Sequence, residues 1–456
     1  MDQAAEISSR DDQTPYEIVA ELARYIGQAR DAAVPAVAKD AALQCIFDLI
    51  VASIVGFNDP GPTSLRQAAK GLFAPGNATI WFAGQTCNAI GAAWANSSAA
   101  AAKDLDDGNR FAAGHPGAAI IPAALATAQE VGATLDQTLA AIVLGYEVAV
   151  TVGSARTTYG SSGTWTPFGV VAAVAALRGT SLGAIEHALA IVGESAPNQS
   201  FAGGPSPRIP HPEGASVKEG IPWGVVTGMT AVLMAEAGHT GPRNILDSRR
   251  HYVFPEDLRL GAALHICQTY FKPYACCRHI HAPLAALHRV MADHGISGAE
   301  IDAIHVETHP PALRISNKAD PENLVDVQYS IPFDLALSAL HGPEMLTPVT
   351  EASLSLPGVR ELARKVTLEV NDAFAAAYPD EILGRVTLTC GDRVLTSAPT
   401  PPEGEPLMSW QELDTKFRRA TRLDLKMDRQ QAILDAMTSL KAGEMRPLLS
   451  QLATPL

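Results

Sequence analysis

Apolar residues recur every three or four positions along most of the first 265 residues, which is the period of an α-helix. Within 35–57 this pattern forms one stripe of large residues: Leu43, Ile46, Phe47, Ile50, Val51 and Ile54. The same periodicity predicts helices over 16–29, 87–102, 117–131, 134–156, 165–178, 181–194 and 222–238. A break rich in proline and glycine at 58–63 ends the second helix, and another helix is expected to begin near Ser64. A short β-like piece at 78–82 interrupts this part of the chain, which is predicted to be mainly helical.

The pattern changes near residue 268. Three later segments, 301–308, 365–370 and 385–390, alternate apolar and polar residues as half-buried strands do, and a helix running to about Asp293 precedes them. Residues 409–455 return to helical periodicity. We therefore predict a mainly α protein with a large all-helical domain, formed by residues 1–268 and 405–456. Residues 269–404 are predicted to form a smaller α/β (α+β) domain.

Composition and charge restrict the class of protein. The 456 residues exceed what one hydrophobic core usually holds, and 47% of them are hydrophobic. The net charge is −14 and the sequence contains no basic tract, which argues against a nucleic acid or an anionic membrane as partner. The polar, acidic residues 1–6 do not resemble a signal peptide, and the apolar run 165–177 is too short to span a membrane. We expect a cytoplasmic protein with reduced cysteines.

A polar loop at 103–117 lies between alanine-rich apolar segments and contains Asp104, Asp106, Asp107, Arg110 and His115. Buried charges are costly unless they are paired or used, so the loop is a candidate site of acid–base chemistry. The imidazole lies just before a predicted helix, whose positive end disfavours imidazolium; we therefore expect a neutral base. A helix cap with a surface salt bridge is the alternative.

A second polar cluster follows residue 270. Lys272, Arg278, His279 and His281 are donors suited to carboxylates. The two histidines, if they alternate along a strand, could bind a metal instead, and the neighbouring cysteines could be nucleophiles. Lys218 lies near the end of a segment rich in glycine, proline and serine at 195–221, just ahead of a predicted helix. A lone lysine at such a point is more often a solvated charge.

The chain lacks the common cofactor and nucleophile motifs. It contains no Gly-x-Ser-x-Gly, no Walker loop, no Gly-x-Gly-x-x-Gly and no Cys-x-x-Cys. We therefore expect no nucleotide, flavin or iron–sulfur cofactor, and the residues favour cofactor-free proton chemistry.

Six motifs, in this order, resemble the signature of the MmgE/PrpD family. They are Asp104-Leu-Asp-Asp107, His115-Pro-Gly117 followed by Pro122-Ala-Ala-Leu-Ala126, Gly163-Thr-x-x-Pro-Phe-Gly169, Val217-Lys-Glu-Gly-Ile-Pro-Trp223, Lys272-Pro-Tyr-x-Cys-Cys-Arg-His-Ile-His281 and Gln328-Tyr-Ser-Ile-Pro-Phe333. That family includes 2-methylcitrate dehydratase, cis-aconitate decarboxylase and iminodisuccinate epimerase. The resemblance implies a homodimer, a cleft between the two domains, small di- or tricarboxylate substrates and no metal.

The resemblance also implies roles for individual residues. Asp104, His115, Lys218 and Lys272 match the family's catalytic pocket. His115, oriented by Asp104, would act as base or acid, and the two lysines would hold substrate carboxylates and stabilise developing charge. Substrate-binding or pocket-supporting roles are predicted for four further residues: Asp107, Arg278, His281 and Tyr159.

Three positions depart from the family pattern. Gly108 stands where a threonine usually follows the aspartate pair, Gly160 where many members have a histidine, and Phe333 where a tyrosine is common. Tyr159 or Tyr329 could supply the missing phenol. We therefore expect a lyase that moves a proton alpha to a carboxylate, with dehydration as the leading reaction. Epimerisation (or isomerisation), decarboxylation and a non-catalytic carboxylate-binding protein are the alternatives.

Overall fold

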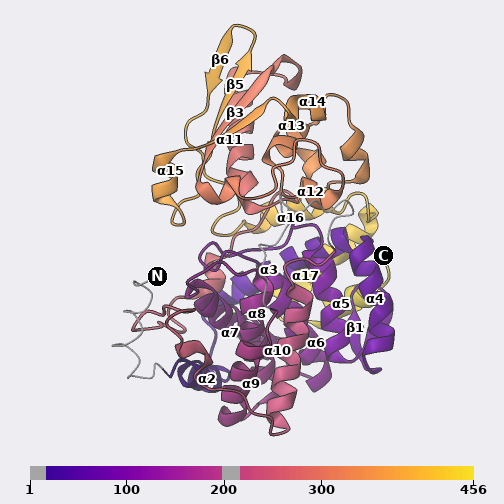
Figure 1. Cartoon of the computed structure of the whole chain (residues 1–456). Coiled ribbons are helices and arrows are strands. Elements are labelled where there is room, and N and C mark those ends of the chain that lie inside the picture. The colour runs from indigo at the N-terminus through magenta and orange to yellow at the C-terminus, as the bar shows by residue number, and fades with distance from the viewer. Residues whose placement is uncertain (1–16, 198–215) are drawn as a thin grey trace, which may run out of the picture.

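A layer of close-packed helices forms the larger of two stacked domains in the computed structural model, which describes residues 17–197 and 216–456 (Figure 1). Its helices are α2 (Ile18–Ala29), α3 (Ala36–Gly56), α4 (Pro60–Leu72), α5 (Ala89–Ala101), α6 (Gly117–Val131), α7 (Leu135–Ser154), α8 (Ser162–Arg178), α9 (Leu182–Ser195) and α10 (Ile221–Glu236). The β-like piece forms an antiparallel pair, β1 (Ala78–Ile80) with β2 (Gln85–Cys87). The predicted helices are confirmed, but α4 begins at Pro60, because prolines fit the first turn of a helix. Residues 1–6 and most of the predicted loop at 195–221 lie outside the described residues.

Small residues let the central helices approach one another closely. A Cβ atom added at Gly169 of α8 would lie 2.3 Å from the carbonyl oxygen of Gly145 in α7, so these helices cross where neither has a side chain. By length and composition, α7 is apolar enough to cross a membrane. However, 83% of its apolar window is buried inside the structure, which is the pattern of a core helix.

The smaller domain combines a sheet with helices (Figure 1). Its strand order is β4-β3-β5-β6, and the strands are β3 (Ala303–Thr308), β4 (Val366–Val370), β5 (Arg385–Cys390) and β6 (Arg393–Thr396). β3 pairs parallel with β4 and antiparallel with β5, and β5 pairs antiparallel with β6. The short, exposed β6 was not predicted. The longer helices here are α11 (Arg278–His294) and α13 (Ile331–His341), with the short α12 (Leu324–Val327), α14 (Val359–Ala363) and α15 (Asp372–Ala377).

His279 and His281 do not alternate along a strand, as the metal-binding alternative required, because both lie in the first turn of α11. Residues two apart on a helix point to different sides. His279 accordingly meets His309, with 2.8 Å between Nδ1 and Nε2, whereas His281 turns to Cys276.

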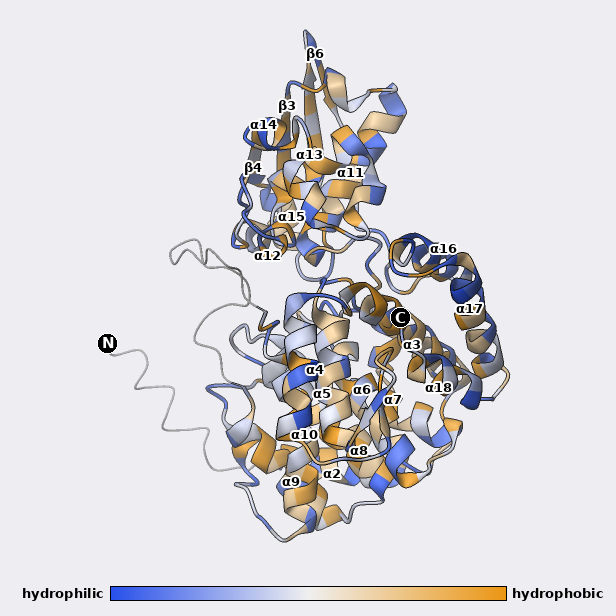
Figure 2. Ribbon diagram, turned by 90° about the vertical axis from the view of Figure 1, so that its right-hand side faces the viewer, coloured by the Kyte–Doolittle hydropathy of each residue, from blue (hydrophilic) through white to orange (hydrophobic). Residues whose placement is uncertain are grey.

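The C-terminal helices return to the helical domain. α16 (Trp410–Ala420) and α17 (Met427–Lys441) pack on α3, and α18 (Arg446–Ala453) packs on β1. Figure 2 shows them along one side of that domain, with hydrophilic outer surfaces on α16 and α17. The chain therefore crosses between the domains twice, and the crossings touch: the Phe271 backbone N–H donates to the Gly404 carbonyl at 2.9 Å. The predicted fold class, a mainly α protein with a smaller α+β domain, is confirmed.

Candidate active site

The acidic loop between α5 and α6 meets the start of the smaller domain. Asp104 has a left-handed backbone (φ 53°) and is 1% exposed. Its Oδ1 accepts a 2.9 Å hydrogen bond from the Nζ of Lys272, which has no exposed surface. Burial opposes ionisation of Asp104, but Lys218, Lys272 and His115 outweigh it and hold the pKa of that carboxyl well below its usual range. The loop thus presents a fixed anion between the domains.

Asp106 adds a second carboxylate to this cluster. Its Oδ1 lies 3.8 Å from the Lys272 Nζ, and its Oδ2 lies 3.3 Å from the His115 Nδ1. Burial again opposes ionisation, and His115 and Lys272 together keep the pKa of Asp106 below its ordinary value. Lys272 therefore pairs with two buried carboxylates at once.

His115 stands between carboxylates on both sides of its ring. Nδ1 donates to the Asp107 carbonyl at 3.1 Å, while Nε2 lies 3.3 Å from Asp104 Oδ1 and 3.8 Å from Glu219 Oε1. Burial and Lys272 disfavour the charged ring, but Asp106 and Glu219 outweigh them and raise the pKa of His115 to about 9. The prediction of a neutral base was therefore wrong: surrounding carboxylates override the positive end of α6, and the ring is an imidazolium.

Lys218 approaches the cluster from the segment before α10. Its Nζ donates to Gln328 Oε1 at 2.9 Å and to the Tyr329 hydroxyl at 2.7 Å, and lies 3.7 Å from Asp104 Oδ1. An ammonium has three N–H donors, so two neutral acceptors leave one for another partner. Gln328 and Tyr329 belong to the smaller domain, so Lys218 also joins the two domains.

Glu219 completes the cluster, and the sequence analysis did not single it out. Its Oε2 accepts from the backbone N–H and the hydroxyl of Ser162, at 3.1 and 2.6 Å, which leaves Oε1 facing His115. The only signal for it in the sequence is its place beside Lys218 in the motif that begins at Val217.

Three of the residues predicted to bind substrate have partners outside the cluster. The Asp107 carboxylate accepts from the Tyr146 hydroxyl at 2.5 Å and the Gly117 N–H at 3.0 Å, and burial raises its pKa to about 7. Arg278 donates to Glu405 Oε2 and to the Glu403 carbonyl. His281 lies against Cys276, and burial keeps its pKa well below the ordinary value.

Tyr159, the fourth predicted substrate-binding residue, is 56% exposed. The Glu219 carboxylate is the main cause that raises the pKa of its phenol. Substrate binding by these four residues stays a prediction.

The three departures from the family pattern have structural counterparts. A Cβ atom at Gly108 would lie 2.3 Å from the Tyr270 hydroxyl, and one at Gly160 would lie 2.5 Å from the Arg156 guanidinium. Larger neighbours thus occupy the space that both glycines leave. Phe333 is fully buried in α13, whereas the nearby Tyr329 presents its phenol to Lys218.

A metal ion does not fit the cluster well. Ligand atoms of Asp104, Asp106 and His115 lie within 4.8 Å of one another, as a cation site would require. However, the Lys272 ammonium lies 2.9 Å from Asp104 and the imidazole is protonated, so an ion would have to displace two positive charges.

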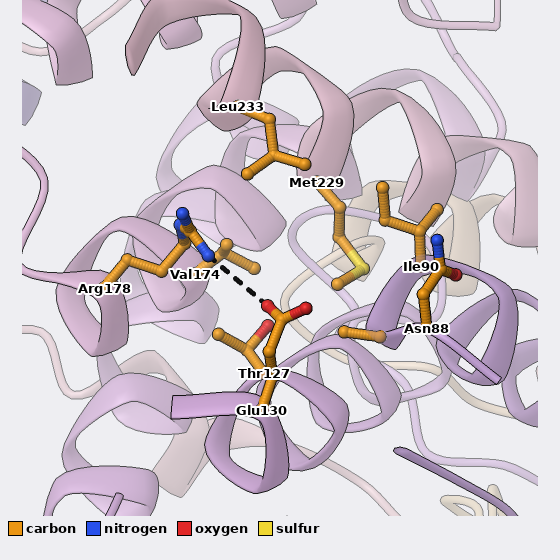
Figure 3. Close-up of a pocket in the computed structure, with 9 residues that line it drawn as sticks. Asn88, Ile90, Thr127, Glu130, Val174, Arg178, Met229 and Leu233 are labelled. Atoms are coloured by element: carbon orange, nitrogen blue, oxygen red, sulfur yellow. Dashed lines mark hydrogen bonds and ion pairs between the residues drawn. The ribbon is translucent and has the colours of Figure 1, made fainter. Parts of the chain in front are cut away.

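Two cavities in the described part of the chain lie away from these residues. The cavity in Figure 3, about 60 Å³, is lined by Ile90, Met229 and Leu233 and closed on one side by the Arg178–Glu130 ion pair. The other, about 340 Å³, lies between Arg30, Lys39 and Asp136. Neither contains a residue of the charged cluster.

The fold and the cluster define a two-domain, mainly helical protein with a buried cluster of charged residues between its domains. Residues 20–253 match the model of the MmgE/PrpD N-terminal domain, and residues 274–442 match that of the MmgE/PrpD C-terminal domain. The chain belongs to the MmgE/PrpD family. It is similar to a cis-aconitate decarboxylase of Aspergillus terreus, with 25% identity over 98% of each chain. A cis-aconitate decarboxylase of Aspergillus terreus (strain NIH 2624 / FGSC A1156) is 26% identical over the same share of each chain.

Proposed function

We propose that this protein is a cofactor-independent lyase that acts on a small di- or tricarboxylate by moving a proton at the carbon alpha to a carboxylate. One observation carries the proposal: Asp104 lies in contact with His115, Lys218 and Lys272 in a single buried cluster. These groups come from different segments and both domains, and burial of so many charges is costly without a use. The family supports an enzyme that acts on small carboxylates.

His115 is the proton donor in this proposal. Nδ1 is held by the Asp107 carbonyl and Asp106, which fixes the ring and leaves the Nε2 proton for transfer. After donation the neutral ring keeps its Nδ1–H bond to the carbonyl, so the same geometry serves both protonation states. Asp104 and Glu219 flank Nε2 and stabilise the imidazolium before transfer.

Lys218 and Lys272 stabilise negative charge on the substrate. The free N–H of Lys218 is placed to bind a carboxylate, and the Lys272 ammonium supplies a fixed positive charge beside Asp104. When the alpha carbon becomes carbanionic, charge moves onto the adjoining carboxylate as an aci-carboxylate. Donors already aimed at that position lower the barrier, because they need no reorganisation.

Dehydration, the leading expectation from the sequence, needs a base for the alpha proton and an acid for the departing hydroxyl. Decarboxylation needs only the acid: the C–C bond to one carboxylate breaks, CO₂ leaves, and the electron pair takes a proton from His115. A resting imidazolium and the two cis-aconitate decarboxylases among the relatives favour this second reaction. Epimerisation would need an acid and a base on opposite faces of one carbon.

Proton NMR in D₂O distinguishes these reactions. The purified protein is incubated separately with cis-aconitate, citrate, 2-methylcitrate, tartrate and an iminodisuccinate analogue. Decarboxylation consumes cis-aconitate, releases CO₂ and places one solvent deuteron in the product. Dehydration instead forms an alkene from a hydroxy acid, and epimerisation exchanges the alpha proton. Binding without exchange or turnover of any compound would contradict the proposal and leave a carboxylate-binding protein.

We further propose that the protein forms a homodimer, as the family resemblance implies. Light scattering on the eluting protein measures this directly, because a dimer has twice the 47.9 kDa mass of the chain. A single species with the mass of one chain would contradict it.

A further inference from the structure

Tyr270 and Lys272 lie on the same side of the first crossing between the domains. Side chains of an extended segment alternate, so residues two apart face the same way. Lys272 points to Asp104, and Phe271 between them is fully buried. Tyr270 therefore faces the charged cluster, although nothing in the sequence distinguished it from a core aromatic residue.

A backbone pair fixes Tyr270 against the acidic loop. The Gly108 N–H donates to the Tyr270 carbonyl at 3.0 Å, and the Tyr270 N–H donates to the Gly108 carbonyl at 2.9 Å. The phenol lies over Gly108: a Cβ atom at Gly108 would lie 2.3 Å from the hydroxyl and 2.4 Å from Cζ. The hydroxyl thus lies beside the loop of Asp104 and Asp106, where any side chain at position 108 would otherwise be.

Arg278 also contacts the Tyr270 ring. That guanidinium lies 4.2 Å from the ring centroid and is anchored by Glu403 and Glu405. The Tyr270 hydroxyl itself has no hydrogen-bond partner among residues 17–197 and 216–456, although the residue is only 4% exposed. A hydroxyl whose oxygen is held in place and whose hydrogen is unused is a donor available to a ligand.

The charges of the cluster explain why a neutral donor is needed. Lys218, Lys272 and the imidazolium of His115 are matched by Asp104, Asp106 and Glu219, so the cluster has little net positive charge to offer an anion. A substrate with two or three carboxylates needs more donors than the free N–H of Lys218. Hydroxyl groups that donate without adding charge supply them.

We propose that the Tyr270 hydroxyl, placed in the space that Gly108 leaves open, donates a hydrogen bond to one carboxylate of the substrate. This inference rests on the proposed function and adds a substrate-binding residue to it. It also accounts for Gly108, because a side chain there would displace the phenol from the cluster.

A purely structural role for Tyr270 is the competing explanation, since aromatic rings often cover a glycine on a neighbouring strand. The chain offers a matched control. Tyr25 also covers a glycine, with its hydroxyl 3.3 Å from where the Cβ of Gly261 would be, but it lies away from the cluster. Tyr270→Phe and Tyr25→Phe each remove one hydroxyl and keep the ring.

Binding of tricarballylate, a saturated tricarboxylate with no group to eliminate, is measured by calorimetry in the wild type and both variants. A hydrogen bond to a charged group contributes about 1.5–3 kcal/mol, so Tyr270→Phe should weaken binding roughly 10- to 100-fold. Tyr25→Phe should leave it unchanged. Glutarate, which lacks the central carboxylate, and succinate, which lacks one terminal carboxylate, show which group the phenol binds. If a probe lacks the carboxylate that the phenol binds, Tyr270→Phe and the wild type should bind that probe equally well.

The outcomes separate the two proposals. If the wild type binds tricarballylate and Tyr270→Phe binds it equally well, the inference is wrong and the proposed function stands. If the wild type neither binds nor turns over any polycarboxylate, the proposed function fails and the inference falls with it. If Tyr270→Phe lowers the melting temperature, the inference is judged by the ratio of its affinities for tricarballylate and glutarate, because that ratio does not depend on the fraction folded. An unchanged ratio for both dicarboxylates would overturn the inference.

Discussion

Lys272 and Asp104 form a buried ion pair between the two domains, with 2.9 Å from Nζ to Oδ1 and almost no exposed surface on either residue. Burial disfavours the lysine's charge, but Asp104 and Asp106 outweigh it and raise the pKa of Lys272 above its usual value. The pair therefore stays ionised in the folded protein. Because the loop of Asp104 also holds His115, this contact couples the position of the smaller domain to the charged cluster.

Lys272→Met is expected to destabilise the protein as well as inactivate it. Removing the ammonium leaves Asp104 and Asp106 buried without their main partner, and breaking a buried pair on one side costs about 3–5 kcal/mol. Urea unfolding measures the loss. The double variant Lys272→Met with Asp104→Asn should recover part of the lost stability, because the unpaired charge of Asp104 is gone. A single variant as stable as the wild type would contradict this account.

His115 should make activity fall at high pH. Its pKa is raised from 6.5 to about 9, so protonation contributes stability that is fully present below about pH 6.5 and is lost as the pH rises through about 9. An acid acting as imidazolium then gives a kcat/KM that declines near pH 9, whereas a neutral base would give a decline below pH 6.5. His115→Ala should reduce turnover by a factor of roughly 100 or more in a folded protein.

Asp106→Asn tests the cause of that raised pKa. Removing this carboxylate, 3.3 Å from Nδ1, should move the decline in kcat/KM to lower pH. Asp320→Asn, on a surface carboxylate paired with Arg364, is the control and should leave the profile unchanged. An unshifted decline in Asp106→Asn would show that another group titrates.

The sequence predicted the fold and the site to different extents. The helical period predicted the elements of the larger domain because those helices bury alanine, glycine and aliphatic residues on regularly spaced positions. It did not predict β6, whose four residues are too few and too exposed to show alternation. Asp104, His115, Lys218 and Lys272 were predicted through motifs, and the structure brings all four together.

What the sequence could not predict depends on contacts between distant segments. His115 was expected to be neutral because only the adjacent helix was considered, whereas Asp106 of the same loop and Glu219, 104 positions later, both face its ring. The position of the Tyr270 hydroxyl over Gly108 likewise arises only when two segments pair. Local pattern shows which groups are present, but not which charges they meet.

Activity is expected to survive prolonged treatment with a chelator. The three groups nearest to a cation site already bind a lysine and a proton, and a metal ion would have to displace both. Turnover of the substrate identified above is compared before and after dialysis against EDTA, together with the metal content of the protein. Stoichiometric metal whose removal abolishes activity, and whose return restores it, would contradict this prediction.

The last prediction concerns Lys218, whose remaining N–H we expect to bind one end of the substrate. Lys218 belongs to the helical domain but rests on Gln328 and Tyr329 of the smaller one, so a carboxylate bound there touches both domains. Replacing that carboxylate by an amide should raise KM, and Lys218→Met should raise KM with the intact substrate. Tyr329→Phe, which removes one acceptor but keeps the ammonium, is the matched control.

The decisive measurement combines the two changes. If Lys218 binds the altered carboxylate, removing the lysine costs little once the charge on the substrate is gone, because the interaction is already lost. If the two increases in KM simply multiply, as independent sites require, Lys218 does not contact that carboxylate. Repeating the comparison with the amide at each end of the substrate then identifies which carboxylate meets Lys218. Lys272→Met is compared in the same way, and we expect its cost to persist with every amide, because Lys272 is fully buried and occupied by Asp104 and Asp106.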